Sequence, residues 1–300
     1  MCVEHVLAGS NGLVAGSPRV SVLMLTCNRP RFLSRAIQSV LSQEFRDWEL
    51  IVVQDGPNKQ TAPAVREWEA RDSRVLFFQR EQIGSIGDAA NFGLRHAKGE
   101  YIAILDDDDY WADPKKLQNQ VHFLDNNPEY VGCGGGMIAV NENGLEINRF
   151  LKPECDESIR SSALLANPMV NSTGMYRRAA AEQIGGYDVT RLVQFQDWDF
   201  WLKLGSLGWL YNFPEPLVCY TIWDGSSSYR HMKSNSRCAL RIVWRHRRSY
   251  PRFAAALALA CAYYSYAHLP ESLRAGSFDL LSQLKKSVFS PRRDAKAIGN

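Results

Sequence analysis

The sequence has 300 residues, of which 45% are hydrophobic and 22% are charged, and its formal net charge is +3. This length and composition allow one sizeable core, or one domain with an appendage, and they exclude a globally disordered chain. The seven cysteines are scattered without a Cys-x-x-Cys pair. That pattern argues against a disulfide framework and a zinc site, and it favours a reducing compartment.

From residue 20 onward, segments typical of strands alternate with segments typical of helices. Residues 20–25 form a near-continuous apolar run, as expected of a strand buried on both faces. Apolar residues at helical spacing follow over 31–43, with Pro30 suited to the first helical turn. The later predicted strands are 49–55, 74–79, 101–106 and 131–140, and the later predicted helices are 60–71, 86–97 and 114–126.

This alternation predicts an α/β fold in which helices cover both faces of a parallel sheet. In such sheets ligands bind beyond the carboxyl ends of the strands. Polar residues gather at these ends: Thr26 and Asn28 follow the first strand, and Asp55 closes the second. Four consecutive aspartates, 106–109, end the strand that begins at residue 101. The sequence therefore predicts a binding site in the first half of the chain.

The four adjacent aspartates are the most unusual feature of the sequence. Their carboxylates repel one another, and a hard divalent cation with oxygen ligands would relieve that repulsion. An acidic turn solvated by water is the alternative interpretation. An EF-hand loop is excluded, because Tyr110 and Trp111 stand where such a loop needs an acid or Asn and then Gly.

Four segments in a fixed order resemble the nucleotide-sugar glycosyltransferases of family 2. The matching segments are 20–56, 97–117, 167–188 and 196–208, so the resemblance covers roughly residues 18–230. It implies an inverting enzyme with the Rossmann-like A-type glycosyltransferase fold, which has a mostly parallel central sheet. Residues 231–300 match no family that we can name.

The resemblance also implies roles for the residues that bind the donor. Thr26, Asn28 and Asp55 would line the pocket of the nucleotide base, typically uracil. Asp106 would contact the ribose or the metal, and Asp107 would also belong to the donor site. For Asp55 the alternative is that it only begins a turn at Asp-Gly.

Two further aspartates would carry the chemistry. Asp108 would ligate the Mn²⁺ or Mg²⁺ that bridges the diphosphate and stabilises its developing charge. Asp197 would be the general base, because an acceptor hydroxyl is a poor nucleophile until a carboxylate takes its proton; a helix N-cap is its alternative role. Two positions depart from the family pattern: Ala90 replaces a common arginine, and Trp223 replaces a histidine that can complete the metal site.

We therefore expect hexosyl or N-acetylhexosaminyl transfer from a nucleoside-diphosphate sugar, specifically a UDP-sugar. The acceptor would be a saccharide or a lipid-linked saccharide in surface polysaccharide or glycoconjugate biosynthesis. One alternative is a nucleotide-sugar-binding scaffold without turnover, which the two departures motivate. The other is a sugar-phosphate nucleotidyltransferase, which would need a glycine-rich loop where residues 27–30 have no glycine.

The chain divides into three parts by these patterns. Residues 1–17 have no basic start and no sustained apolar run, so we interpret them as a flexible lead rather than a signal peptide. Residues 18–230 form the catalytic domain, with a donor half over 18–110 and an acceptor half over 111–230. Residues 231–300 form a basic, helical appendage.

The appendage begins with a strongly basic stretch. Residues 225–270 contain eight Lys or Arg and no Asp or Glu; since the whole chain carries +3, the remainder carries −5. Six of these residues recur at helical spacing: Lys233, Arg237, Arg241, Arg245, Arg248 and Arg252.

We expect all six on one face of an amphipathic helix that ends or kinks at Pro251. The uncharged stretch 253–269 follows; it is shorter than the about 20 residues that span a bilayer. Such a pair of segments suits an anionic membrane surface. We therefore predict a cytoplasmic enzyme that is peripheral on the inner face of the membrane. Packing of the basic helix on the catalytic domain is the alternative, and nucleic acid is not an expected partner.

Overall fold

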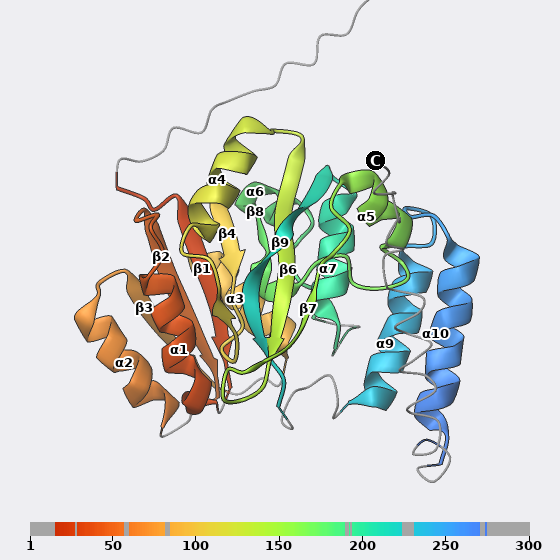
Figure 1. Ribbon diagram of the computed structural model, residues 1–300, viewed down its shortest axis with the longest axis horizontal. Helices are drawn as coiled ribbons and strands as arrows, with labels where there is room; N and C mark the ends of the chain where they lie inside the picture. Colours follow the sequence, from red (N-terminus) through yellow and green to blue (C-terminus); the bar gives the residue numbers. More distant parts are fainter. Residues whose placement is uncertain are drawn as a thin grey trace, which may run out of the picture.

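The computed structural model describes residues 16–270 and residue 274, except 28, 57–59, 82–84, 190–191, 193 and 224–230. Within these residues, helices cover both faces of one mixed, nine-stranded sheet (Figure 1). The strand order is β3-β2-β1-β4-β8-β6-β9-β5, and β7 pairs with β6. The predicted lead, residues 1–17, lies almost wholly outside the described residues.

The bounds of the strands and helices follow the chain order. The strands are β1 (Val20–Thr26), β2 (Trp48–Asp55), β3 (Val75–Arg80), β4 (Tyr101–Ile104), β5 (Tyr110–Trp111), β6 (Tyr130–Val140), β7 (Glu146–Phe150), β8 (Met175–Arg177) and β9 (Trp209–Thr221). The helices are α1 (Pro30–Leu41), α2 (Thr61–Arg71), α3 (Ile86–His96), α4 (Lys116–Asn126), α5 (Asp156–Ser162), the 3-10 helix η1 (Asn171–Thr173), α6 (Arg178–Gln183), α7 (Gln196–Gly205), α9 (Met232–Arg245) and α10 (Phe253–His268).

The first half of the sheet is parallel, as the strand–helix alternation predicts. β1 pairs in parallel with both β2 and β4, and β2 pairs in parallel with β3. The carboxyl ends of these strands therefore lie along one edge. β8 runs antiparallel to both β4 and β6, which makes the whole sheet mixed.

Burial on both faces explains the apolar runs of the central strands. Val22 and Met24 of β1 belong to the core cluster that contains the buried faces of α1 and α4. Leu23, which points the opposite way, belongs to the cluster that contains residues of α3 and α7. Because successive side chains of a strand alternate between faces, a strand with two covered faces must be apolar throughout.

Two boundaries differ from the sequence-based expectation. β4 ends at Ile104, two residues before the predicted end of that strand, so Asp106 stands in the turn before β5 together with the other three aspartates. α9 ends at Arg245, well before Pro251. The prediction that one helix carries all six basic residues was therefore wrong for Arg248 and Arg252, which lie between α9 and α10. Arg252 adopts a left-handed backbone conformation (φ 62°) at the start of α10.

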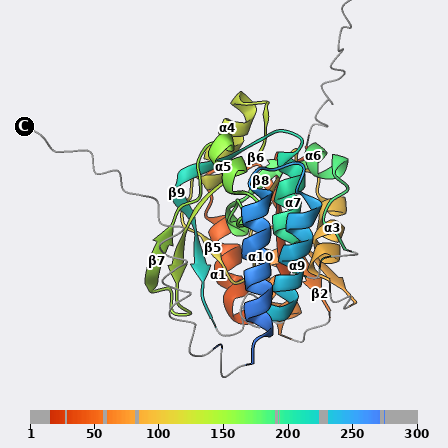
Figure 2. The same cartoon turned by 90° about the vertical axis from the view of Figure 1, so that its right-hand side faces the viewer.

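The two C-terminal helices pack side by side on the outer flank of the molecule (Figure 2). α9 is not detached from the helices that cover the sheet. Its buried Ile242 and Val243 share an apolar cluster with Trp198 and Leu202 of α7. In the described part of the chain, no helix has both the length and the apolarity to cross a membrane.

A buried ionic network reinforces the contact between α9 and α7. Asp199 of α7 is fully buried; its Oδ2 lies 3.0 Å from Nη1 of Arg245, and its Oδ1 lies 2.8 Å from Nε2 of His246. Arg245 Nη1 also lies 2.6 Å from Oδ2 of Asp188, and Lys203 Nζ lies 3.3 Å from Asp199 Oδ2.

Replacing Asp199 with Ala should lower the free energy of unfolding by about 1–3 kcal/mol, because it removes the buried acceptor of the His246 ring and one of the two carboxylate partners of the partly exposed Arg245. Urea denaturation measures this loss. Arg237→Ala, an exposed change on the same face of α9 as Arg241, should stay within roughly 0.5 kcal/mol of the unmodified protein. Equal stabilities of the Asp199 variant and the parent would show that the network does not hold α9 in place.

Candidate active site

The four aspartates lie at the carboxyl edge of the sheet, in the turn that joins β4 to β5. Asp107 and Asp109 are buried, whereas Asp106 and Asp108 are partly buried. Each carboxylate is held by a different set of neighbours, which come from segments far apart in the chain.

Arg29, which follows β1, neutralises part of this charge. Its Nη2 lies 2.6 Å from Oδ1 of Asp107, and its Nη1 donates to Oδ2 of Asp108 over 2.7 Å. Burial raises the pKa of Asp107 to about 7, although the Arg29 guanidinium opposes that rise. The sequence reasoning did not single out Arg29; the available signal was its place in the same polar loop as Asn28.

Asp109 joins the acidic turn to two other segments. Its Oδ1 accepts from the backbone N–H of Thr221 over 2.9 Å, at the end of β9. Ser172 Oγ of η1 lies 2.6 Å from Asp109 Oδ2 and 3.1 Å from Asp106 Oδ2. A serine hydroxyl has one proton to donate, so both contacts are hydrogen bonds only when one of the carboxyl groups is protonated. Burial, followed by the charges of Asp108 and Asp106, holds the pKa of Asp109 well above its usual range.

Trp223 occupies the position where the family pattern has a histidine. Its indole Nε1 donates to Oδ2 of Asp108 over 2.9 Å, and its ring packs on Phe32 with the centroids 5.4 Å apart. The same Asp108 oxygen therefore receives hydrogen bonds from both Arg29 and Trp223. Trp223 acts on the predicted metal ligand as a hydrogen-bond donor.

A short segment before β8 connects the acidic turn to the predicted base. Asn167 Nδ2 donates to Oδ2 of Asp197 over 2.6 Å. Asn171 Nδ2 donates to Oδ1 of Asp106 over 3.3 Å, next to the Ser172 contact. Residues 167–172 thus hold Asp197 at one end and Asp106 at the other. Sequence reasoning placed this segment in the family resemblance but assigned no role to these side chains.

Asp197 lies in the first turn of α7, after Phe195, which has a left-handed backbone (φ 59°) that is uncommon for a residue other than glycine. Burial raises its pKa, and hydrogen bonds from the α7 backbone and from Asn167 oppose that rise. Burial, then the charge of Asp108 and also that of Asp197, raise the pKa of Asp106 to about 6. Asp197 and the acidic turn therefore lie within electrostatic reach of each other.

The remaining predicted residues stand at the ends of β1 and β2. Thr26 is buried at the end of β1, and Asp55 is partly buried at the end of β2. Burial, and then the charge of Asp55, raise the pKa of the Cys27 thiol between them. Asn28 lies outside the described residues, so the structure does not place it.

Ala90, where the family pattern has an arginine, is buried in α3. A cation stands nearby in the fold instead. Arg80 closes β3 as the register partner of Asp55, and its Nη2 lies 2.9 Å from Oδ2 of Asp88.

The described residues can supply only some of the ligands of a divalent cation, so the substrate would have to supply the others. They contain no group of three His, Cys, Asp or Glu side chains suited to hold a metal by themselves. The acidic turn can nevertheless supply Asp108, and the buried Oδ1 of Asn171 has no hydrogen-bond partner among the described residues. Mg²⁺ in particular is often bound by one or two carboxylates together with substrate phosphates, and this donor set has that character.

Solved structures share the overall architecture of the chain. A TarS fragment from S. aureus in complex with UDP-GlcNAc superimposes with a TM-score of 0.62 and 19% identity, over 90% of this chain and 77% of that one. The mannosyltransferase PcManGT from Pyrobaculum calidifontis, in complex with GDP-Man and Mn²⁺, gives a TM-score of 0.58 and 19% identity, over 91% and 81%. This likeness confirms the predicted A-type glycosyltransferase fold.

Sequence relatives carry the argument from fold to family. EpsE of Bacillus subtilis, which is named as a glycosyltransferase, is 32% identical over 216 residues, or 71% of this chain and 76% of EpsE. MJ1057 of Methanocaldococcus jannaschii, named as an uncharacterized glycosyltransferase, is 29% identical over 241 residues, or 78% and 82%. The sequence profile described as Glycosyl transferase family 2 matches residues 21–185. The chain therefore belongs to glycosyltransferase family 2 and is an enzyme that transfers a sugar from a nucleotide-sugar donor.

Proposed function

We propose that this enzyme transfers a hexose or N-acetylhexosamine from a UDP-sugar to an acceptor hydroxyl, with inversion and with a divalent cation. One observation carries the proposal: residues 167–172 bind the carboxylate of Asp197 at one end and that of Asp106 at the other. A donor held by the acidic turn would therefore present its sugar next to a buried carboxylate that can act as a base.

The donor would lie across the ends of the parallel strands. Thr26, Asn28 and Asp55 would surround the nucleotide base, with Asp106 and Asp107 on the remainder of the donor. In this division residues 18–110 form the donor half and 111–230 the acceptor half. Arg29 would keep the carboxylates of the acidic turn in place, because it contacts two of them at once.

Asp197 would take the proton of the acceptor hydroxyl as its oxygen attacks the anomeric carbon. The C–O bond to the diphosphate breaks on the opposite side, so a single displacement inverts the configuration. The raised pKa of Asp197 suits this role, because a base works best when its pKa approaches the working pH. The α7 N-terminus then favours the carboxylate once it is ionised.

Asp108, together with the diphosphate and Asn171 Oδ1, would hold a Mn²⁺ or Mg²⁺ ion. Such an ion stabilises the negative charge of the departing diphosphate as a Lewis acid. Asp108 would ligate the ion through Oδ1, because Arg29 and Trp223 both donate to its Oδ2.

The names of similar proteins favour surface polysaccharide synthesis as the setting. TuaG of Bacillus subtilis, named for teichuronic acid biosynthesis, is 28% identical over 220 residues. The solved neighbours contain UDP-GlcNAc in one case and GDP-Man with Mn²⁺ in the other. We propose a saccharide or a lipid-linked saccharide as the acceptor, with UDP as the nucleotide to test first and GDP as its competitor.

Asp197→Asn should lower turnover by about 10²–10⁴, the usual loss for a missing general base. Donor affinity should hardly change, because an asparagine can still accept from Asn167. Steady-state rates and donor titrations measure the two effects separately. Glu182→Gln, the same acid-to-amide change at an exposed site on α6, should leave both unchanged. Loss of donor binding with normal turnover of bound donor would place Asp197 in the donor site instead.

Asp108→Asn should abolish the cation-dependent part of donor binding, because an amide is a poor ligand for a hard divalent ion. The fold should persist, since the amide oxygen can still accept from Trp223. A melting-temperature screen of UDP, GDP and their sugars, with and without Mn²⁺, tests this through mass action. Full activity of the parent in excess chelator would rule out the cation, whichever donor binds.

The buried carboxyl of Asp107 makes stability depend on pH. Its pKa is about 7 in the folded protein and about 3.9 in an unfolded chain, so the folded state binds the proton more tightly. The free energy of unfolding should therefore fall as pH rises from about 4 to about 7, by roughly 4 kcal/mol from this group. Asp107→Asn should remove that part of the slope in urea denaturation. Parallel pH curves for variant and parent would contradict the assignment.

A further inference from the structure

α9 and α10 form an outer surface that combines cations with exposed apolar side chains. The α9–α10 surface, as we use the term, comprises the exposed residues of 232–269. Among its large apolar side chains, Trp244 is 56% exposed, Leu259 45% and Tyr264 36%. Its exposed basic residues are Lys233, Arg237, Arg241, Arg245, Arg248 and Arg252.

Charge on this surface has one sign. Residues 225–270 contain no Asp or Glu, so nothing within α9 or α10 offsets their cations. α10 carries no Lys or Arg either, and its outward face consists of alanines, Leu259, Cys261, Tyr264 and Ser265. A basic helix thus lies beside an uncharged, apolar one on the same flank (Figure 2).

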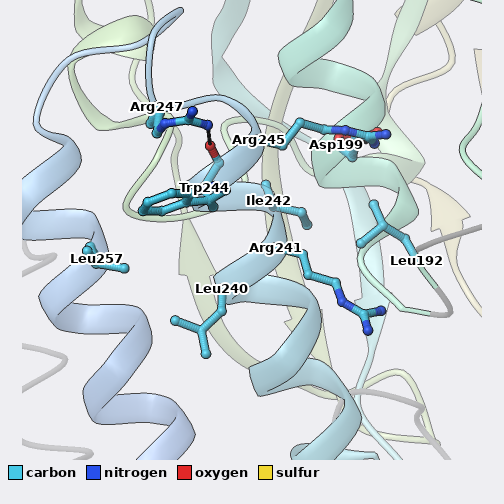
Figure 3. Close-up of a pocket in the computed structure, with 9 residues that line it drawn as sticks. All are labelled: Leu192, Asp199, Leu240, Arg241, Ile242, Trp244, Arg245, Arg247 and Leu257. Atoms are coloured by element: carbon cyan, nitrogen blue, oxygen red, sulfur yellow. Dashed lines mark hydrogen bonds and ion pairs between the residues drawn. The ribbon is translucent and has the colours of Figure 1, made fainter.

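A cavity of about 760 Å³ lies beside α9, and its lining contains basic and apolar side chains together with Asp199 of α7. Figure 3 shows Leu240 and Trp244 of α9 directed toward the side of α10, where Leu257 lies, and Arg241 directed away from it. Large apolar side chains of α9 thus lie on the side that faces α10, and Arg241 lies on the opposite side.

Not every cation of α9 is available to a partner. Arg245 is committed to Asp188 and Asp199 inside the protein. Arg247 lies over the ring of Trp244 at 4.6 Å and donates to the carbonyl of the same residue. The exposed side chains of Arg237, Arg248 and Arg252 carry the outward charge that matters here.

We propose that the α9–α10 surface docks this enzyme on the anionic face of a lipid bilayer. Acidic headgroups complement the outward arginines, whose aliphatic stems can lie along apolar surface. Trp244 and Tyr264 have the amphipathic rings that favour the depth of the headgroups. The apolar side of α10 supplies area to bury at that boundary.

A second copy of the chain fits this surface less well. A two-fold interface would place the same patch against itself, and that would bring the outward arginines of both copies together without an acid from either pair of helices. Nucleic acid would complement the arginines but would leave the apolar face of α10 uncovered.

Docking in this way would set the active site beside the membrane. α9 begins at Met232, at the edge of the molecule where β9 ends and where Trp223 meets the acidic turn (Figure 1). A lipid-linked acceptor could then reach Asp197 without leaving the bilayer. This last consequence rests on the proposed function, whereas docking itself does not.

The test is co-sedimentation of the full chain with vesicles of phosphatidylcholine alone or with phosphatidylglycerol added. Binding should require the anionic lipid and weaken as salt rises, because exposed charges are screened. The triple variant Arg237→Gln, Arg248→Gln, Arg252→Gln should bind about a hundredfold more weakly. Arg245 stays unchanged, since its loss would disturb the buried network.

Two controls make the result specific. Arg46→Gln, Arg66→Gln, Arg71→Gln removes the same charge from exposed sites around α2, on the far side of the molecule (Figure 1), and should bind like the parent. Leu259→Ser should weaken the binding that remains at high salt. Donor-induced changes in melting temperature should be the same for all these variants, which separates docking from the donor site.

Three results would overturn the proposal. Equal partition of the parent and the α9 triple variant would show that the arginines do not contact lipid. An equal loss in the α2 triple variant would reduce the effect to net charge. A dimer in light scattering that Leu259→Asp dissociates, without any change in vesicle binding, would assign the surface to a second copy of the chain.

Discussion

Four adjacent carboxylates at the end of a buried strand are the constraint around which this site is built. Their mutual repulsion and their burial both oppose ionisation, so the turn needs compensating groups that the strand itself cannot supply. Arg29 provides charge from the loop after β1, and Ser172 provides a hydroxyl from η1. Thr221 and Trp223 complete the shell from the end of β9. The site therefore forms only when three distant segments have come together.

The same contacts order the rest of the active site. Because residues 167–172 contact both Asp106 and Asp197, one short segment positions the acidic turn and the base relative to each other. α7, which carries the base, also contacts the C-terminal end of α9 through the hydrogen bonds of Asp199 with Arg245 and His246. The C-terminal helices are thus part of the support of the base, although they lie outside the sheet.

Acidic and basic side chains gather on two different surfaces of the molecule, and each surface favours a different kind of partner. The strand edge gathers carboxylates, which favours cations and hydrogen-bond donors. The α9–α10 surface gathers arginines beside exposed apolar side chains, which favours an anionic and amphipathic partner. α10 is the least polar helix in the described part of the chain, and its outward face stays uncovered.

Much of this protein was determined by local sequence. The apolar runs of β1 and β2 predict buried parallel strands, because only a strand covered on both faces needs such a run. Strand–helix alternation then places Thr26, Asp55 and the acidic turn at one edge, which the structure confirms. The family followed from four segments that occur in a fixed order along the chain.

Only the tertiary structure decided which side chains meet. Sequence spacing does not show that Arg29 bridges two aspartates 78 and 79 positions later, or that Trp223 donates to Asp108, since such pairs depend on how strands are ordered in the sheet. It also could not end α9 at Arg245, because the periodicity of the basic residues continues beyond the helix. Periodicity shows which basic residues could share one face of a helix. Only the structure shows that Arg245 is paired with the buried Asp199 and does not belong to the outward charge.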